Sequence, residues 1–155
     1  MPETTKAKQP KTKKEIHPRG HVLSVSGTVI DVQFSQEHMP DILNALHIIF
    51  PKGSDPAQAT IEVAQQLGDS IVRCIAIDNI FNISRGLSVI DTGSPIKVPV
   101  GNEVLGRLFN VLGQTIDNKP PLHVKKKWSI YRQAPPLVQQ KIANEIQETG
   151  IKIID

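Results

Sequence analysis

The sequence predicts a mainly β fold over residues 20–95, in the form of a small barrel or sandwich of five or six short strands. Short runs of β-branched and alternating residues are separated by frequent turn signals, and the 155 residues include 12 prolines and 10 glycines. Apolar residues make up 39% of the chain and aromatic residues only 4%, so we expect one aliphatic core rich in Ile and Val.

The first 19 residues are predicted to form a disordered basic tail, because they offer almost nothing to bury. Residues 1–20 carry six basic and two acidic side chains, which leaves 12 basic and 13 acidic side chains in the rest of the chain. The positive charge therefore belongs to the tail, whereas nucleic-acid-binding domains usually carry it on the folded surface.

The first two predicted strands are the runs 21–27 and 28–34, and the second of them alternates apolar and polar residues as a half-buried strand does. Gly27 lies between the runs, where we expect a bulge or a sharp bend. Residues 41–50 are predicted to form a turn that leads into another strand.

A β-hairpin is predicted over residues 60–77, where the runs 60–67 and 71–77 flank the turn residues Gly68-Asp69-Ser70. Cys74 lies in the second run, and we expect a small buried side chain there rather than a reactive thiol. Two further short strands are predicted to follow, at 88–91 and 96–100. A turn is predicted before each of them, at 84–87 and at 92–95.

The pattern changes after residue 100. Apolar positions 104, 105, 108, 111 and 112 have helical spacing, which predicts a helix over 102–112 with Asn102 as N-cap and Gly113 just beyond its end. Residues 114–136 are predicted to be mostly loop. A second helical stretch is predicted over 137–147, and Thr149 could cap a third.

Gly101 and Gly106 have the glycine spacing of a phosphate-binding loop, but that loop needs a lysine and a hydroxyl residue directly afterwards. Arg107 and Leu108 stand at those positions. We therefore interpret the segment as a helix N-terminus, with Gly106 at a close contact.

No other group of residues has the spacing of a catalytic or metal site. The five histidines (17, 21, 38, 47 and 123) are scattered, and Glu145 with Glu148 is most simply a solvated helix face. The basic run 125–127 beside Trp128 could bind a phosphate backbone, but we favour a solvated loop with Trp128 against a neighbouring domain. The sequence thus predicts no catalytic, cofactor-binding or metal-binding residue.

No apolar run approaches the length of a membrane span, and no secretory signal is visible. The tail matches a mitochondrial presequence poorly, because it is rich in lysine and contains two glutamates.

Taken together, these segments resemble the N-terminal part of the β subunit of the rotary F-type ATP synthase, from Gly20 to Asp155. The stretches that carry the resemblance are 25–34, 39–46, 62–68, 72–73, 85–86, 89–96, 98–101, 105–113, 116–117 and 148–152. Among them, Met39-Pro40-Asp41-Ile42-Leu43-Asn44-Ala45-Leu46 is similar to the β subunit rather than to the related α subunit. The chain departs from the family at Tyr131, where histidine is common, and in a more basic loop at 119–128.

The resemblance implies a six-stranded barrel over residues 20–95, followed at 96–155 by the truncated start of an α/β nucleotide-binding domain. In the intact head, such barrels form a ring of three α and three β subunits. The family's phosphate loop, catalytic glutamate and adenine-stacking aromatics lie later, so no catalytic residue carries over. ATP, ADP and Mg²⁺ belong to the intact family member and are not expected to bind this chain. With part of that domain lacking, residues past about 114 are expected to be mobile or sticky.

We therefore expect a β-subunit-like component of an ATP synthase head, inactive alone, which contacts α and β subunits through its barrel. It would meet a membrane only through the assembled complex, at the cytoplasmic side of a bacterial inner membrane rather than in a plastid or mitochondrion. A freestanding nucleic-acid-binding barrel with a basic arm is the alternative. A third hypothesis is a split gene, whose second product supplies the phosphate loop.

Overall fold

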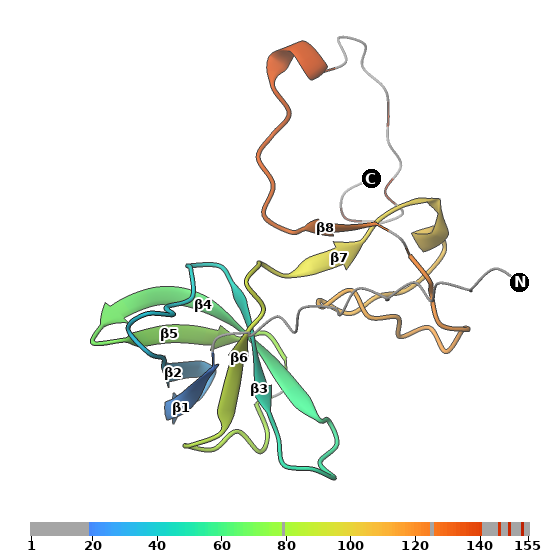
Figure 1. The fold of residues 1–155 in the computed structure, drawn as a ribbon. Coiled ribbons are helices and arrows are strands. Elements are labelled where there is room, and N and C mark those ends of the chain that lie inside the picture. The colour runs from blue at the N-terminus through green and yellow to red at the C-terminus, as the bar shows by residue number, and fades with distance from the viewer. Residues whose placement is uncertain are drawn as a thin grey trace, which may run out of the picture.

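The computed structural model describes residues 19–78, 80–124 and 126–140, with the single residues 146, 149 and 153. Six antiparallel strands close into a barrel in the order β1-β2-β5-β4-β3-β6, with β6 pairing back onto β1 (Figure 1). The strands are β1 (Arg19–Ser26), β2 (Val29–Gln33), β3 (Ala45–Ile49), β4 (Gln58–Gly68), β5 (Ile71–Ala76) and β6 (Ser88–Asp91). The predicted mainly β fold and the six-stranded barrel are confirmed.

The barrel closes around an aliphatic core because its strands alternate inward apolar and outward polar residues. In β2, Ile30 and Val32 are fully buried, and Asp31 between them faces outward. The buried core consists of Val22, Ile30, Val32, Phe34, Leu46, Ile48, Phe50, Ala59, Ile61, Val63, Val72, Cys74 and Val89. Its composition agrees with the predicted aliphatic core.

β4 is the longest strand, with 11 residues, and it joins the two halves of the barrel. Its first part pairs with β3, where Glu62 lies opposite Ala45, and its second part pairs with β5. The register shifts between Val63 and Gln65 and again between Gln66 and Gly68. Such bulges bend a strand, and the bend lets β4 pass from one side of the barrel to the other.

The predicted β-hairpin is the β4–β5 pair. Asp69 and Ser70 form its turn with φ angles of 49° and 62°, the left-handed pair that a type I′ turn requires. Gly27, with a φ of 59°, makes the expected sharp bend between β1 and β2. The bulge in that pair lies elsewhere, between Val22 and Ser24.

Buried polar contacts hold the exit from the barrel. The Asn44 amide donates to the Asp91 carboxylate at 3.3 Å, and the Gly93 N–H donates to the same carboxylate at 2.9 Å. The Thr92 hydroxyl donates to the carbonyl oxygens of Ala45 and Ser94, each at 2.8 Å. These bonds tie the chain after β6 to the start of β3, so its direction on leaving the barrel is defined.

After the barrel, β7 (Lys97–Pro99) and β8 (Lys127–Ser129) form a separate two-stranded antiparallel sheet. Two short 3₁₀ helices, η1 (Asn102–Val104) and η2 (Leu137–Gln139), accompany it. Figure 1 shows this sheet beside the barrel, joined to it by the yellow-green chain between β6 and β7. The described residues contain no helix long and apolar enough to cross a bilayer.

The helix predicted over 102–112 is wrong. Only the short 3₁₀ helix η1 forms there. Asn102 is its first residue rather than its N-cap, and the N-cap is Gly101, which has no side chain to form a capping bond. Residues 108–116 fold back as a small loop, in which the Ile116 N–H donates to the Leu108 carbonyl at 3.0 Å. A bridge between Phe109 and Thr115 closes this loop.

Two physical causes prevent this helix. Gly106 has a φ of 67°, in the left-handed region that a right-handed helix excludes, and the Asn110 side chain accepts the N–H groups of Leu112 and Gln114. Leu105 and Val111 are 74% and 70% exposed, so the apolar stripe packs against no surface formed by the residues that the structure describes. Helices depend on that packing more than on intrinsic propensity.

The second predicted helix, over 137–147, is reduced in the described residues to η2. Residues 141–145 and 147 lie outside the described residues, as do residues 150–152, where the helix that Thr149 was expected to cap would begin. The predicted disordered tail also falls outside them, except for Arg19, which begins β1.

Candidate functional site

The segment with phosphate-loop spacing has its charged group already engaged. The Arg107 guanidinium binds the Asp117 carboxylate through both Nε and Nη2, and Nη2 lies 3.0 Å from Oδ1 and 3.0 Å from the Pro120 carbonyl oxygen. The hydrogen bonds from Arg107 hold the pKa of Asp117 well below its usual range. Arg107 therefore braces the loop, and it is not free to receive a phosphate.

The expected close contact at Gly106 is wrong, because a Cβ there would meet no atom within 4 Å. The close approach is at Gly113 instead, where a Cβ would lie 2.6 Å from the Cδ of Pro99. Gly113 therefore lets the 108–116 loop pack directly on β7.

No three metal-ligating side chains gather at one place among the described residues. His47, on β3, is half-buried, with Nδ1 3.4 Å from the Thr60 hydroxyl, and burial lowers its pKa. His21, His38 and His123 are exposed, and His17 lies outside the described residues. Cys74 is fully buried, as predicted, and burial raises the pKa of its thiol to about 12.

The basic run beside Trp128 forms a cationic cluster. The Nζ of Lys126 lies 4.8 Å from the centre of the Trp128 ring, and the guanidinium carbon of Arg132 lies 3.8 Å from it. These are cation–π distances. The ring is 39% exposed, and Lys125 lies outside the described residues.

A side-chain contact joins the post-barrel segment to the outer face of the barrel. The Tyr131 hydroxyl donates to Oε1 of Glu62, on β4, at 2.7 Å. The other oxygen, Oε2, is buried without a hydrogen-bond partner among the described residues. Nearby, the Ile130 N–H donates to the Ile96 carbonyl at 3.0 Å. Sequence reasoning missed this contact, and its only trace was the tyrosine where the similar family commonly has histidine.

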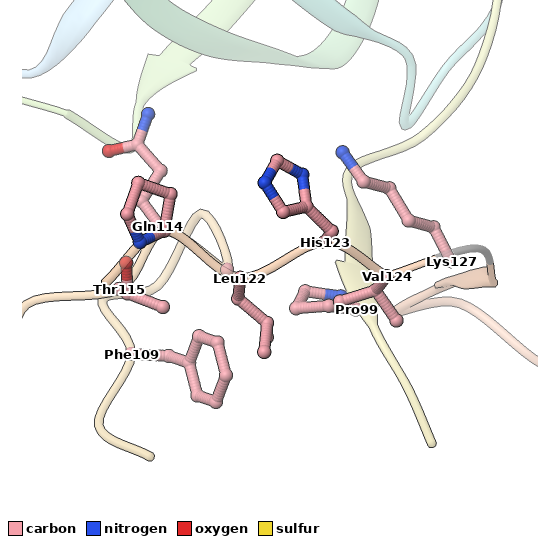
Figure 2. A pocket seen from close by; sticks show the side chains of 10 residues that line it. Pro99, Phe109, Gln114, Thr115, Leu122, His123, Val124 and Lys127 are labelled. Atoms are coloured by element: carbon pink, nitrogen blue, oxygen red, sulfur yellow. The ribbon is translucent and has the colours of Figure 1, made fainter. Parts of the chain in front are cut away.

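A groove of about 560 Å³ lies between β7, the 108–116 loop and the chain leading to β8. Its walls are polar and apolar in equal parts, with Phe109 and Leu122 on the apolar side. In Figure 2 the amide of Gln114, the ring of His123 and the amine of Lys127 point to one side, and Phe109 and Leu122 point to the other. The sequence did not predict this groove, because the segments that form it are distant in the chain.

The outer face of the barrel combines a charged row with exposed apolar side chains. Arg73 Nε lies 2.9 Å from the Asp31 carboxylate, and the Ser24 hydroxyl donates to the same carboxylate at 3.1 Å. Five large apolar residues of the barrel and its loops are exposed: Val25, Ile42, Leu67, Ile75 and Phe81. Exposed apolar side chains on a small closed barrel suit contact with other protein surfaces.

In a comparison with protein-family models, residues 22–93 match the ATP synthase alpha/beta family, beta-barrel domain. The match begins in β1 and continues two residues past the end of β6, so it covers nearly all of the closed barrel and excludes the β7–β8 sheet. The matched residues and the six-stranded topology agree with each other. Residues 22–93 of this chain form the β-barrel domain of the ATP synthase alpha/beta family.

Proposed function

We propose that this chain is a β-subunit-like component of the catalytic head of a rotary, ion-translocating ATP synthase. The single observation that supports this role most strongly is the match of the family's β-barrel domain to residues that close into a six-stranded barrel. A domain of this family implies assembly with other ATP synthase subunits. We propose that its partners are α and β subunits, each contacted barrel to barrel.

The choice of the β type rests on sequence. Residues 39–46 are similar to the β rather than to the α subunit, and they lead directly into β3. In the assembled head, ATP, ADP and Mg²⁺ would be handled by the complete nucleotide-binding domains. The complex would sit at the cytoplasmic side of a bacterial inner membrane, and this chain would reach the membrane only through it.

We also propose that the 155-residue chain does not turn over ATP by itself. Its only segment with phosphate-loop glycine spacing lacks the lysine and the hydroxyl residue, and Arg107 in that segment is bound to Asp117. Without such groups, the charge on the transferring phosphoryl has nothing to stabilise it. We expect the purified chain to show only background hydrolysis of Mg-ATP, and turnover above background would contradict this proposal.

The alternative, a freestanding nucleic-acid-binding barrel, is not favoured. The chain after residue 20 carries 12 basic against 13 acidic residues, and the Trp128 ring already packs against two cations. Phosphate binding would weaken steeply as salt rises. Titration with RNA at two salt concentrations is the direct test of that alternative.

The proposed barrel contact can be tested by mixing the chain with a purified α subunit and measuring the mass of the species by analytical ultracentrifugation. We expect a complex that contains both chains. Ile75 is 46% exposed on β5, so Ile75→Glu should weaken the complex without unfolding the barrel. Lys52→Glu, in the exposed β3–β4 loop, is the matched control and should leave it intact. A chain that stays alone at every concentration would overturn the proposal.

A further inference from the structure

The β7–β8 sheet leaves one edge of β8 open. Val98 lies opposite Trp128, the Val100 N–H donates to the Lys126 carbonyl at 3.1 Å, and the Ile130 N–H donates to the Ile96 carbonyl. Backbone groups alternate in direction along an antiparallel strand. The N–H and C=O groups of Lys127 and Ser129 therefore point away from β7, where no strand of the described residues pairs with them.

Two cations lie beside this edge, at Lys126 and Arg132, on the sheet face that carries Trp128. Neither of them forms an ion pair with a residue that the structure describes. Arg132 packs on the Trp128 ring with its guanidinium carbon 3.8 Å from the ring centre. A guanidinium packed on a ring in this way can still direct N–H donors outward, and its fork of donors matches a carboxylate.

From this arrangement we propose that the open edge of β8 is a docking surface for an extended, acidic segment of a partner protein. The segment adds as a third strand beside β8, and its backbone pairs with Lys127 and Ser129. Its carboxylates, on the face that carries Trp128, bind Arg132 and Lys126. Strand addition supplies affinity through main-chain hydrogen bonds, and the charged side chains supply the preference for acidic residues.

The partner is a protein segment rather than a nucleic acid for two reasons. Base stacking needs a free aromatic face, and the Trp128 ring already contacts two cations. A free backbone edge is a feature that a peptide can use and a phosphate backbone cannot. The proposal concerns the sheet after the barrel, so it does not depend on the proposed role of the barrel.

The test uses the full chain and a fluorescently labelled, blocked peptide of alternating Glu and Val, about eight residues long, within the usual range of strand lengths. Binding is followed by the anisotropy of the label. The fluorescence of Trp128, the only tryptophan, is a second readout. We expect saturable binding that weakens as salt rises. The same peptide with Gln in place of Glu, or with alternate backbone nitrogens methylated, should bind about tenfold more weakly or worse.

Variants of the chain separate the contributions. Arg132→Gln and Lys126→Gln should each weaken binding several-fold, and Arg132→Lys should restore only part of the loss, because it keeps the charge without the fork. Lys52→Gln, which removes a charge from the barrel loop, should bind like the unmodified chain.

Four results would overturn the proposal. The first is no binding at about 1 mM peptide, which is the upper end of weak affinities. The second is that the methylated peptide binds as tightly as the unmethylated one, and the third is that Arg132→Gln binds the peptide as tightly as the unmodified chain. The fourth is tighter binding of a uridine oligonucleotide than of the acidic peptide. Binding would also be absent if acidic residues of this chain itself occupied the open edge of β8, and the proposal of a partner segment would then be wrong.

Discussion

At the scale of single residues, the contact between Tyr131 and Glu62 joins the barrel to the segment after it by side chains. The hydrogen bond to Glu62 raises the pKa of Tyr131 above its ordinary value. Because folding raises the pKa of Tyr131, its hydrogen bond to Glu62 contributes fully to stability below the pKa of about 10 that tyrosine has in the unfolded chain. This contribution is lost as the pH rises through the pKa of Tyr131 in the folded chain. The joint is therefore insensitive to pH near neutrality.

Tyr131 is the only tyrosine, so its ionisation can be measured by ultraviolet absorbance of the phenolate. We expect its pKa to lie above that of an unfolded control in the unmodified chain, and to fall toward the ordinary value in Glu62→Gln, which has no carboxylate charge. Glu103→Gln, at an exposed glutamate elsewhere, should leave the titration unchanged. Equal titration curves in the unmodified chain and Glu62→Gln would show that the contact does not form.

Cys74 illustrates a residue whose behaviour follows from burial alone. Its thiol is fully buried and its pKa is raised to about 12, so thiolate is scarce at neutral pH. We expect no reaction with iodoacetamide in the folded chain and rapid reaction once urea unfolds the barrel. In urea titration, Cys74→Ser should lower the free energy of unfolding by about 1 to 3 kcal/mol, because it buries a hydroxyl. Cys74→Ala should lack that polar penalty, and rapid labelling of the native chain would contradict the burial.

At the scale of elements, the β4–β5 turn carries strain in its second residue. Asp69 and Ser70 both adopt left-handed φ angles, which a serine adopts less readily than glycine does. We expect Ser70→Gly to raise the free energy of unfolding by about 0.5 kcal/mol, because Asp-Gly is a preferred type I′ pair. Ser84→Gly, at a loop position without a left-handed φ, should not stabilise the chain. Urea titration of both variants measures the difference, and equal effects would contradict the turn assignment.

The element scale also separates the successful predictions from the failures. The β4–β5 hairpin could be predicted because its two runs and its turn are contiguous, so local propensity and tertiary pairing favour the same structure. The fate of the helix predicted over 102–112 could not be inferred from neighbouring residues in this way. Its apolar spacing was genuine, but whether such a stripe packs depends on a surface that lies elsewhere in the chain.

At the scale of the whole molecule, the barrel and the segment after it should differ in stability. The barrel has a closed sheet and a continuous core, whereas the β7–β8 sheet has two short strands and exposed apolar neighbours such as Val138. Isolated two-stranded sheets are marginally stable in water. We expect amide hydrogen exchange to be slow in β2, β4 and β5 and much faster at residues 97–140, measured by mass spectrometry at neutral pH. Equal protection in both parts would show that the segment folds with the barrel as one unit.

Much of the candidate site also became visible only at this scale. The sequence predicted that Gly101 to Leu108 is not a phosphate site, from the missing lysine and hydroxyl. The structure adds the partner that engages Arg107, namely Asp117. Glu62 and Tyr131 lie 69 positions apart. No local pattern marks such a pair, because the contact exists only after β4 and the post-barrel chain are brought together.

The amino-acid sequence alone determined the strand runs of residues 20–95, their tight turns, their aliphatic core and the burial of Cys74. These features follow from alternation and turn chemistry, which act over a few neighbouring residues. Tertiary structure alone decided the chain beyond residue 96. There, the backbone conformation depends on Arg107 meeting Asp117, on Tyr131 meeting Glu62, and on the absence of a described surface over the apolar side chains near Leu105. Those interactions join residues that are distant in sequence, so spacing and propensity could not reveal them.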